Sequence, residues 1–381
     1  MLKKKLDYKI QNEIRTWDIN IPISVLDDLK KTIKSKWINT GPKEKEFRNQ
    51  IKNRFKAKYA VATNSGTSSL RVALAVLGVG PGDEVISTAY TWLATNTAIL
   101  EQGAKPVFAD INYDDLNISI DDIESKITKR TKAIICVHYA GNPVDLDRLN
   151  KISKNYNIPI IEDSAHAMGS EYKGKPIGSS GNICCFSFQC VKIVTCGDGG
   201  VVTCGNRKTY EKLQSKIWYG FNKEKKKINF LNPVPENPDG LGFKMNMNDI
   251  VATFACSAMN ELDKALKIRR KIGSIYRNEF KNLNKIKLIN YKKDRKPNYQ
   301  IFPIHVDNRE KFAKYMWDNN VQVNINNRRN DIYSIFGGKN KKLINLNKAD
   351  NDTILLPLHL GLKNPDIEKI VGLVSKFDRI I

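Results

Sequence analysis

The chain of 381 residues is long enough for one large domain and a smaller one, and its 41% hydrophobic residues suffice for a continuous core. No run of about 18 apolar residues occurs, and the basic N-terminus has no apolar segment of the secretory type, so we expect no membrane span and no secretory signal. The formal net charge is +23, but the lysines are scattered among many Asn and Ile residues. This pattern favours solvated basic faces over a nucleic-acid site, although a positive field would also attract an anionic substrate such as a nucleotide diphosphate.

The first 55 residues are predicted to contain an arm and two helices. Residues 1–16 are polar and are interpreted as an N-terminal arm. Residues 24–34 are predicted to form a helix with Ser24 as its N-cap. A turn at 37–42 and a charged helix over 43–55 follow. Apolar residues of the first helix recur at helical spacing and are expected to form one buried face: Val25, Leu26, Leu29 and Ile33.

From residue 59 onward, strand-like and helical patterns alternate. Strands are predicted at 59–63, 84–87, 106–109, 133–138 and 158–161. Helices are predicted between them, at 70–77, 91–102, 121–127 and 145–156. Such alternation predicts a mostly parallel sheet with helices on both faces, in which ligands bind beyond the carboxyl ends of the strands.

Beyond residue 200 the chain is predicted to complete this large domain and to form a smaller one. A strand at 201–204 and a helix at 208–218 precede a Lys-, Asn- and Pro-rich loop at 221–239, which is long enough to be a lid or a partner contact. A long helical stretch over 249–283 leads into a C-terminal α/β domain with predicted strands at 299–306 and 321–325 and a last helix at 366–377. We therefore divide the chain into an N-terminal arm, a large domain, and a linking helix with a small domain, at 1–16, 17–250 and 251–381.

The seven cysteines indicate a reducing compartment rather than a disulfide framework. Seven is an odd number, and five of them lie in or beside apolar strand-like runs: Cys184, Cys185, Cys190, Cys196 and Cys204. Buried free thiols in a cytoplasmic protein show this pattern. No cysteine pair is combined with a second pair, or with histidines, at zinc-binding spacing, so no metal site is expected.

The stretch 186–200 combines features of a catalytic site. It begins as an apolar strand, turns polar at Gln189, presents Lys192 and ends in a Gly-Asp-Gly-Gly turn. Adjacent glycines permit positive φ or a close approach of the backbone to a ligand. A lysine at the open end of a buried strand can lose its proton by desolvation and become an amine nucleophile. Taken alone, Lys192 is better interpreted as one of many solvated surface lysines than as a reactive amine.

Three further features follow strands upstream of Lys192. The segment 65–68, Ser-Gly-Thr-Ser, opens a helix, and its free N–H groups and hydroxyls could bind an anion or form an ordinary N-cap. Trp92 opens the next helix and would face the same crevice or pack in the core. Asp163 ends an apolar strand, with His166 three residues later. A buried carboxylate needs a partner, which a protonated ring nitrogen would supply; the alternative is a helix cap.

One cofactor would use all four features at once. Pyridoxal phosphate (PLP) requires an amine for its aldehyde, an acid that keeps its pyridine nitrogen protonated, a flat ring against its face and a cup for its phosphate. Each feature is a weak signal alone. Their joint occurrence in this order predicts a PLP site.

Several segments of the chain match one enzyme family. They are residues 37–42 (WINTGP), 65–70 (SGTSSL), 80–86 (GPGDEVI), 132–135 (KAII), 137–141 (VHYAG), 162–169 (EDSAHAMG), the lysine stretch and 242–249 (GFKMNMND). With these segments the chain resembles the DegT/DnrJ/StrS family, the nucleotide-sugar aminotransferases of the fold type I PLP-dependent superfamily. The resemblance implies an α/β fold in which a large domain, with a mostly parallel sheet of the seven-stranded type between helices, is joined to a smaller C-terminal α/β domain.

The resemblance implies roles for individual residues. Lys192 matches the lysine that binds the cofactor aldehyde, Asp163 the partner of the pyridine nitrogen, and His166 a residue at the phenolic oxygen. The other expected cofactor contacts are Gly66, Thr67 and Ser187 at the phosphate, Trp92 stacked on the ring, and Asn246, which would reach the phosphate in the neighbouring subunit. Expected substrate contacts are Thr40, His138, Lys244 and Arg328.

The resemblance also implies an activity. A homodimer with two shared active sites would move an amino group from L-glutamate to a nucleotide-linked keto-deoxysugar. Our first interpretation is UDP- or dTDP-4-keto-6-deoxyglucose, converted to a 4-amino-4,6-dideoxy sugar; a GDP-perosamine-type or 3-keto-sugar aminotransferase is the alternative. Residues 324–331 depart from the His-Tyr-x-Pro-Leu-His-like segment of many members, and Asp198 stands where Glu is frequent. The first departure leaves the sugar open.

Two other functions remain as alternatives. Members of the family that deoxygenate sugars carry His in place of the lysine, so Lys192 argues against that reaction. A non-enzymatic regulatory or nucleic-acid-binding protein is a more remote possibility that the positive charge allows. A steep loss of DNA affinity with rising salt would identify it.

Overall fold

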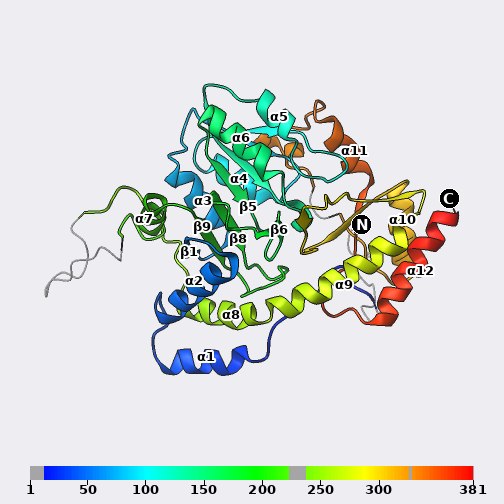
Figure 1. Ribbon diagram of the computed structural model, residues 1–381, viewed down its shortest axis with the longest axis horizontal. Coiled ribbons are helices and arrows are strands. Elements are labelled where there is room, and N and C mark those ends of the chain that lie inside the picture. The colour runs from blue at the N-terminus through cyan, green and yellow to red at the C-terminus, as the bar shows by residue number, and fades with distance from the viewer. Residues whose placement is uncertain (1–12, 223–236, 326–327, 381) are drawn as a thin grey trace, which may run out of the picture.

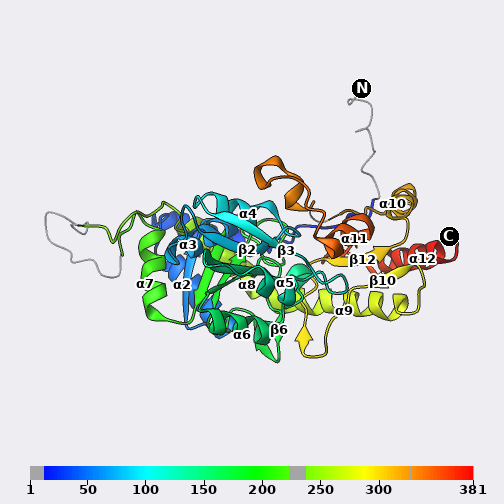
Figure 2. The same ribbon diagram turned by 90° about the horizontal axis from the view of Figure 1, so that it is seen from above.

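The computed structural model of the protein describes residues 13–222, 237–325 and 328–380. It contains a large sheet between helices, and a smaller antiparallel sheet toward the C-terminus (Figures 1 and 2). Most of the predicted arm at 1–16 and most of the predicted loop at 221–239 lie outside the described residues. Within them, no helix has both the length and the apolar character that crossing a membrane requires.

The large sheet has seven strands in the order β1-β9-β8-β5-β4-β2-β3. Its strands are β1 (Tyr59–Thr63), β2 (Glu84–Thr88), β3 (Lys105–Ala109), β4 (Thr131–Val137), β5 (Ile160–Asp163), β8 (Ile183–Ser187) and β9 (Gly200–Cys204). Strands β3, β2, β4, β5 and β8 pair in parallel, whereas β9 is antiparallel to both β8 and β1. All strands except β9 therefore end at the same edge, which confirms the predicted mostly parallel sheet.

Helices cover both faces of this sheet. On one face, α3 (Gly66–Val76), α4 (Leu93–Leu100) and α7 (Arg207–Lys216) form a core with alternate residues of the strands, such as Val61, Ile161 and Cys185. On the other face, the cores are completed by α2 (Pro42–Phe55), α5 (Ile120–Ser125), α6 (Leu146–Tyr156) and α8 (Asp249–Asn260). The strands are apolar on both sides because both faces are covered.

A long helix connects the large sheet with the smaller one. Helix α9 (Leu262–Phe280) contributes its first turns to the core under the large sheet and its last turns to a second core (Figure 1). That second core surrounds the sheet β10-β12-β13. The remaining elements are β10 (Ile286–Leu288), β12 (Phe302–Val306), β13 (Thr353–Leu356), α10 (Arg309–Asp318), α11 (Ile344–Asp352) and α12 (Asn364–Ile380), and a small sheet of β6 (Glu171–Tyr172), β7 (Lys175–Pro176) and β11 (Arg295–Lys296).

Two predicted elements differ in the structure. The helical stretch predicted at 249–283 is two helices, α8 and α9, that meet at Glu261. Residues 321–325 do not form a strand; Val321 and Asn324 make isolated bridges to Ile14 and Leu355 instead. Val321 and Val323 are buried in the second core. An extended segment that is buried but has no continuous ladder of backbone hydrogen bonds shows the same sequence pattern as a strand.

Helix α1 (Val25–Lys34) confirms the predicted span but not its predicted buried face. Val25 is buried, whereas Leu26 and Ile33 are 65% and 60% exposed. The helix packs on α8 through polar side chains, including a hydrogen bond between the hydroxyls of Thr32 and Thr253. Ser24 precedes the helix without a side-chain capping hydrogen bond. Two of the four apolar residues of α1, Leu26 and Ile33, therefore point away from the described core.

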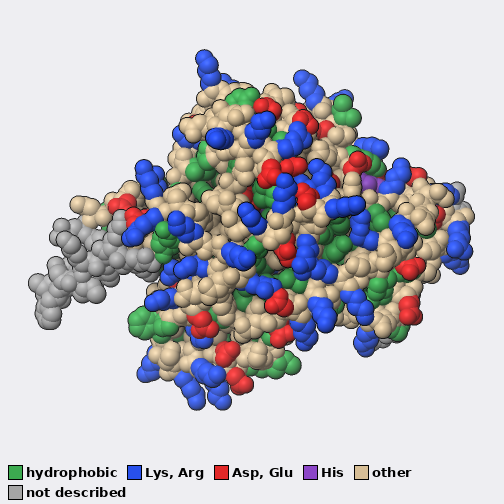
Figure 3. Space-filling view, viewed as in Figure 1, with side chains coloured by type: hydrophobic (Ala, Val, Ile, Leu, Met, Phe, Trp, Pro, Cys, Tyr) green, Lys and Arg blue, Asp and Glu red, His purple; other side chains and the backbone are tan. Residues whose placement is uncertain are grey.

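The basic side chains do not gather in one patch on the face seen in Figure 3. Lys and Arg side chains are spread over it and alternate with Asp and Glu. Many are paired, as in Arg130 with Glu84 and Lys296 with Glu171. This distribution is typical of solvated faces.

Candidate active site

The carboxyl edge of the large sheet brings three predicted site residues together. Asp163 is the last residue of β5 and Ser187 the last residue of the neighbouring β8. Lys192 lies in the turn that follows β8, where its backbone N–H donates to the carbonyl of Gln189 at 2.9 Å. Because parallel strands end at one edge, their terminal side chains share one region of the molecule.

Asp163 is buried and held by two hydrogen bonds. The residue is 4% exposed. The Thr95 hydroxyl on α4 donates to one carboxylate oxygen at 2.7 Å, and the backbone N–H of Ala165 donates to the other at 3.1 Å. Burial raises the pKa of Asp163, and these hydrogen bonds and the positive charge of Lys192 partly oppose the rise. A cation beside this buried carboxylate would therefore stabilise its charged form.

Lys192 has the electrostatics of a reactive amine. Burial lowers the pKa of its ammonium group from 10.5 to about 8, while the negative charge of Asp163 opposes that change. The charges of Asp163 and Lys192 therefore influence each other's pKa. A lysine with this pKa is unprotonated in about a tenth of the molecules at pH 7, far more often than an exposed lysine.

His166 presents a ring nitrogen without a partner. Its Nδ1 atom is shielded from solvent and has no hydrogen-bond partner among the described residues. Burial, with a smaller contribution from Lys192, holds the pKa of His166 well below its usual value of 6.5. The ring is neutral at physiological pH and does not supply a positive partner for Asp163. An unpaired buried nitrogen is costly, and a ligand group beside it would remove that cost.

A small anion cradle lies at the start of α3. Ser65 caps the helix, with its hydroxyl oxygen accepting from the N–H of Ser68. A Cβ atom on Gly66 would lie 2.7 Å from the Cβ of Ser187, so only glycine allows this approach. The structure thus joins Gly66 and Ser187, and Thr67 follows in the first turn. Free N–H groups at a helix N-terminus favour phosphate binding.

The Gly-Asp-Gly-Gly turn serves close packing. Gly197 has φ of +83°, which glycine adopts readily. A Cβ atom on Gly200 would lie 2.3 Å from the carbonyl oxygen of Ser65. Gly200 thereby brings the start of β9 against the segment that begins α3.

Trp92 is not a core residue. It precedes α4 and is 66% exposed, so the expected alternative of a core indole is wrong. The same helix carries Thr95, the partner of Asp163. Stacking of the indole on a ring remains a prediction.

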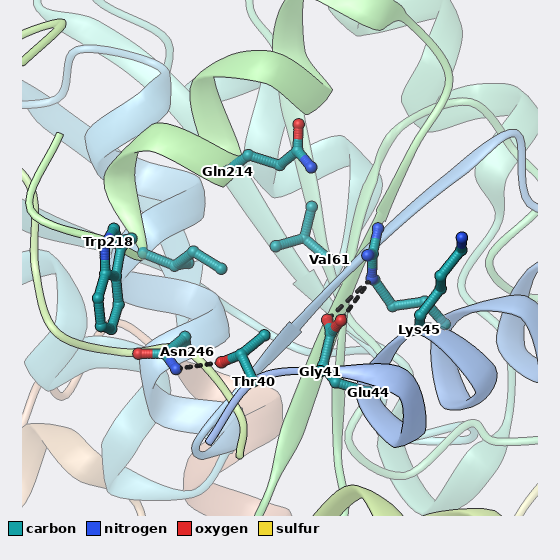
Figure 4. A pocket seen from close by; sticks show the side chains of 10 residues that line it. Thr40, Gly41, Glu44, Lys45, Val61, Gln214, Trp218 and Asn246 are labelled. Carbon is teal, nitrogen blue, oxygen red and sulfur yellow. Dashed lines mark hydrogen bonds and ion pairs between the residues drawn. The ribbon is translucent and has the colours of Figure 1, made fainter. Parts of the chain in front are cut away.

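Thr40, Lys244 and Asn246 form a second cluster. The amide nitrogen of Asn246 donates to the Thr40 hydroxyl, and the Lys244 ammonium donates to the amide oxygen of Asn246 at 2.8 Å. Lys244 also lies over the Trp218 ring, 4.3 Å from its centroid. Figure 4 shows Thr40, Trp218 and Asn246 at a cavity of about 200 Å³, into which Gln214 and Val61 also point. Asn246 lies beside the end of β1, bridged to Thr63.

His138 is not a substrate contact in this structure. It is fully buried; its Nε2–H donates to Glu162 at 3.0 Å, and its Nδ1 accepts from the backbone N–H of Val144 at 3.1 Å. Both ring nitrogens are thus engaged inside the protein. The resemblance implied a substrate role for His138, but its side chain lies on the side of the sheet where Glu162 lies.

Arg328 is exposed, and its neighbours anchor the small domain to the site. Arg329 is fully buried and forms a two-pronged ion pair with Asp331. The Asn330 side chain donates to the carbonyl of Thr91 at 2.8 Å and accepts from Asn96 at 2.7 Å. This segment was noted only for departing from a family pattern. Its contacts with Thr91, just before α4, and with Asn96, within α4, hold the helix that carries Thr95.

Similarity to known proteins shows which enzyme family has this site. The model of the DegT/DnrJ/EryC1/StrS aminotransferase family matches residues 23–375. The chain belongs to this family. Its members are PLP-dependent sugar aminotransferases, and the predicted fold type, reaction class and cofactor are thereby confirmed.

Relatives of this aminotransferase cover nearly its whole length. A UDP-4-amino-4-deoxy-L-arabinose–oxoglutarate aminotransferase from Shewanella sediminis is 33% identical over 368 residues, covering 90% of this chain and 92% of the relative. The structure of AtS13 from Actinomadura melliaura has 31% identity and a TM-score of 0.91, covering 96% of this chain and 98% of that one. The PLP form of a sugar aminotransferase assigned to Streptococcus pneumoniae, Spr1654, has 27% identity and a TM-score of 0.87, covering 97% and 99%.

The residues of this sugar aminotransferase fit PLP. The unpaired Nδ1 of His166 and the cradle between Gly66 and Ser187 are features that a ring with a polar substituent and a phosphate would satisfy. Lys192 would hold the cofactor aldehyde and Asp163 the ring nitrogen. When bound, PLP supplies an electron sink that acidifies the Cα proton of an amino donor.

Proposed function

We propose that this aminotransferase moves the amino group of L-glutamate to the ketone of a nucleotide-linked sugar. The observation that carries the proposal is a buried amine of lowered pKa, Lys192, whose charge acts on the buried carboxylate Asp163, in a member of a sugar aminotransferase family.

Each residue of the site has a separate role in the proposed reaction. The Lys192 Nζ, which is neutral in an appreciable fraction at pH 7, accepts the Cα proton of the donor and returns it one step later. Asp163 keeps a positive charge on the ring nitrogen, and Thr95 orients that carboxylate. Neutral His166 offers Nδ1 as a hydrogen-bonding atom at the ring.

We propose UDP- or dTDP-4-keto-6-deoxyglucose as the acceptor, with the 4-amino-4,6-dideoxy sugar as product. A relative of 33% identity is named for a UDP-linked 4-amino sugar and for oxoglutarate, which supports a 4-keto position and a glutamate donor. That relative is named for a pentose, so a UDP-4-keto pentose belongs in the same test. Thr40, Lys244 and Arg328 would contribute to the sugar-nucleotide side.

A substrate panel tests this proposal. The purified enzyme, PLP and L-glutamate are incubated with UDP-, dTDP- and GDP-linked 4-keto sugars and with a 3-keto sugar, and product mass and 2-oxoglutarate are followed. We expect amination of a UDP- or dTDP-linked 4-keto sugar with equal formation of 2-oxoglutarate. Turnover of the GDP-linked or 3-keto compounds alone would contradict the proposed sugar, and turnover of none would contradict the function.

We also propose a homodimer and place the enzyme in the cytoplasm. An apolar surface comes from one short stretch of the chain, with exposed side chains at Ile19, Ile21, Ile23, Leu26 and Ile33. Solvated monomers rarely expose so many large apolar side chains together, and a second copy of the chain would cover them. All seven cysteines are free, which suits a reducing compartment.

A paired substitution tests the dimer. Ile23→Asp with Leu26→Asp places charges at side chains that are 81% and 65% exposed, so the folded chain should tolerate them. We expect the wild type to sediment as a dimer at micromolar concentration and the double variant as a monomer. Ile344→Asp on α11, at a side chain that is 73% exposed but outside this surface, should leave the dimer intact. A monomeric wild type would refute the proposed assembly.

A further inference from the structure

One short segment hydrogen-bonds the backbone beside Lys192 and the backbone at His166. It comprises Asn298, Tyr299 and Gln300, between β11 and β12, and is called the bracket here. Asn298 is fully buried and Gln300 is 6% exposed. Neither was singled out from the sequence, because nothing in the pattern Pro-Asn-Tyr-Gln marks a contact with residues more than a hundred positions away.

Gln300 holds the backbone on both sides of Lys192. Its amide nitrogen donates to the carbonyl of Val191 at 2.9 Å, and its amide oxygen accepts from the N–H of Ile193 at 3.1 Å. One side chain thus pairs with the residues before and after the lysine, as a strand partner would. The turn that carries Lys192 has little regular structure of its own, so these two hydrogen bonds fix the direction of its Cα–Cβ bond.

Asn298 does the same for the segment of His166. Its amide nitrogen donates to the carbonyls of His166 and Met168 at 2.9 and 2.8 Å. Its amide oxygen accepts from the N–H of Gln300 at 2.9 Å, which links the two contacts. The two sides of the site, one carrying the amine and the other the imidazole, are therefore held by one piece of chain.

The bracket itself is strained and firmly anchored. Tyr299 has φ of +54°, an unfavourable conformation for an aromatic residue. Arg269 on α9 donates to the carbonyls of Tyr299 and Gln300 at 2.9 and 3.0 Å. A Cβ atom on Gly273 would lie 2.8 Å from the Tyr299 ring, so α9 has a glycine where the ring packs. Strain that is maintained by such contacts is frequently found beside functional sites.

We propose that Gln300, supported by Asn298, is a positioning residue that keeps the Lys192 amine in its desolvated place facing Asp163. This inference rests on the proposed role of Lys192. Among the described residues, the Asp163 carboxylate and the Cys190 thiol act on the charge of the amine, and the amine acts on His166. The Gln300 side chain makes no hydrogen bond to any of these groups. A substitution at Gln300 therefore changes the position of the amine and not the charged groups around it.

The test uses the full chain freed of cofactor. Lys192 is labelled with acetic anhydride between pH 6 and 11, and its peptide is quantified by mass spectrometry against the exposed Lys264. We expect a titration midpoint near 8 in the wild type and a rise of at least about one pH unit in Gln300→Met, which has a similar volume but cannot form the two hydrogen bonds. The amine fraction at pH 7 then falls about tenfold.

A matched control separates positioning from general loosening. Asn117 is 2% exposed, and its amide likewise joins two backbone groups, donating to the carbonyl of Asn142 and accepting from the N–H of Tyr139. Asn117→Leu should leave the Lys192 midpoint unchanged. An unchanged midpoint in Gln300→Met, or an equal rise in both variants, would overturn the proposal.

A measurement on the wild type guards against a variant that fails to fold. The Ile193 amide, which donates to Gln300, should exchange its hydrogen slowly, like amides of β8. Exchange as fast as that of an exposed loop amide would overturn the proposal. Neither measurement needs bound cofactor or turnover, so a failed bracket and a failed aminotransferase assignment give different results.

Discussion

Lys192→Ala is expected to abolish amino transfer, with a loss of at least about 10⁴-fold in kcat. Proton transfer by a positioned base alone contributes about 10²–10⁴-fold, and this variant also loses the amine that anchors the cofactor. In the wild type, borohydride reduction should attach the cofactor to the peptide that contains Lys192. The variant should show neither the absorbance of lysine-bound cofactor nor the reduced peptide adduct.

Two controls distinguish a missing amine from a damaged fold. Lys264→Ala removes a lysine whose side chain is 74% exposed on α9 and should keep full activity. Adding a small primary amine such as ethylamine to Lys192→Ala should restore part of the rate, because the cavity left by the side chain can admit it. Persistence of turnover and of the borohydride adduct in Lys192→Ala would disprove the assignment.

The ends of the parallel strands were the part of the site that the sequence could predict. Asp163 and Ser187 each follow an apolar run, and the alternation of strands with helices places their ends at one edge. The chemistry of a residue type then suggests its role, as for Lys192. Such inferences need only local patterns and one rule about parallel sheets.

Contacts between distant segments could not be predicted in this way. Thr95 meets Asp163 across 68 positions, and Gln300 meets the Lys192 turn across more than a hundred. When both faces of a sheet are buried, the sequence does not show which face a residue points to, so it did not reveal that His138 bonds Glu162. The exposed apolar residues of α1 could not be predicted for a similar reason, because periodicity shows that a helix face is apolar but not what covers that face.

Adjacent carboxylates on β5 permit a sharper prediction about Asp163. Successive strand residues point to opposite faces, so Asp163 faces α4 while Glu162 faces α6. Glu162 accepts hydrogen bonds from His138, Ser180 and Asn182 at 3.0, 2.6 and 2.8 Å. One carboxylate therefore lies in the site and the other in a structural network.

The pKa directions of the two carboxyls are opposite. Burial raises the pKa of Asp163, so its charge in the cofactor-free protein opposes folding at neutral pH, and its contribution to stability is fully favourable only below its unfolded value. For Glu162, burial alone would raise the pKa, but hydrogen bonds from His138, Ser180 and Asn182 lower it overall. Its stabilising contribution is present above the unfolded pKa and is lost as the pH falls through the folded value.

Asp163→Asn should therefore reduce kcat by about 10²–10³-fold, as expected for the loss of one preorganised electrostatic partner, while the cofactor-free protein remains at least as stable as the wild type at pH 7. Glu162→Gln should lower the free energy of unfolding at pH 7 by about 1.5–3 kcal/mol, with kcat of the folded fraction nearly unchanged. The stability difference between Glu162→Gln and the wild type should shrink toward pH 3, which denaturant titrations at several pH values would measure. If Asp163→Asn retains full activity, or if Glu162→Gln loses activity without losing stability, the assignment of the two faces is wrong.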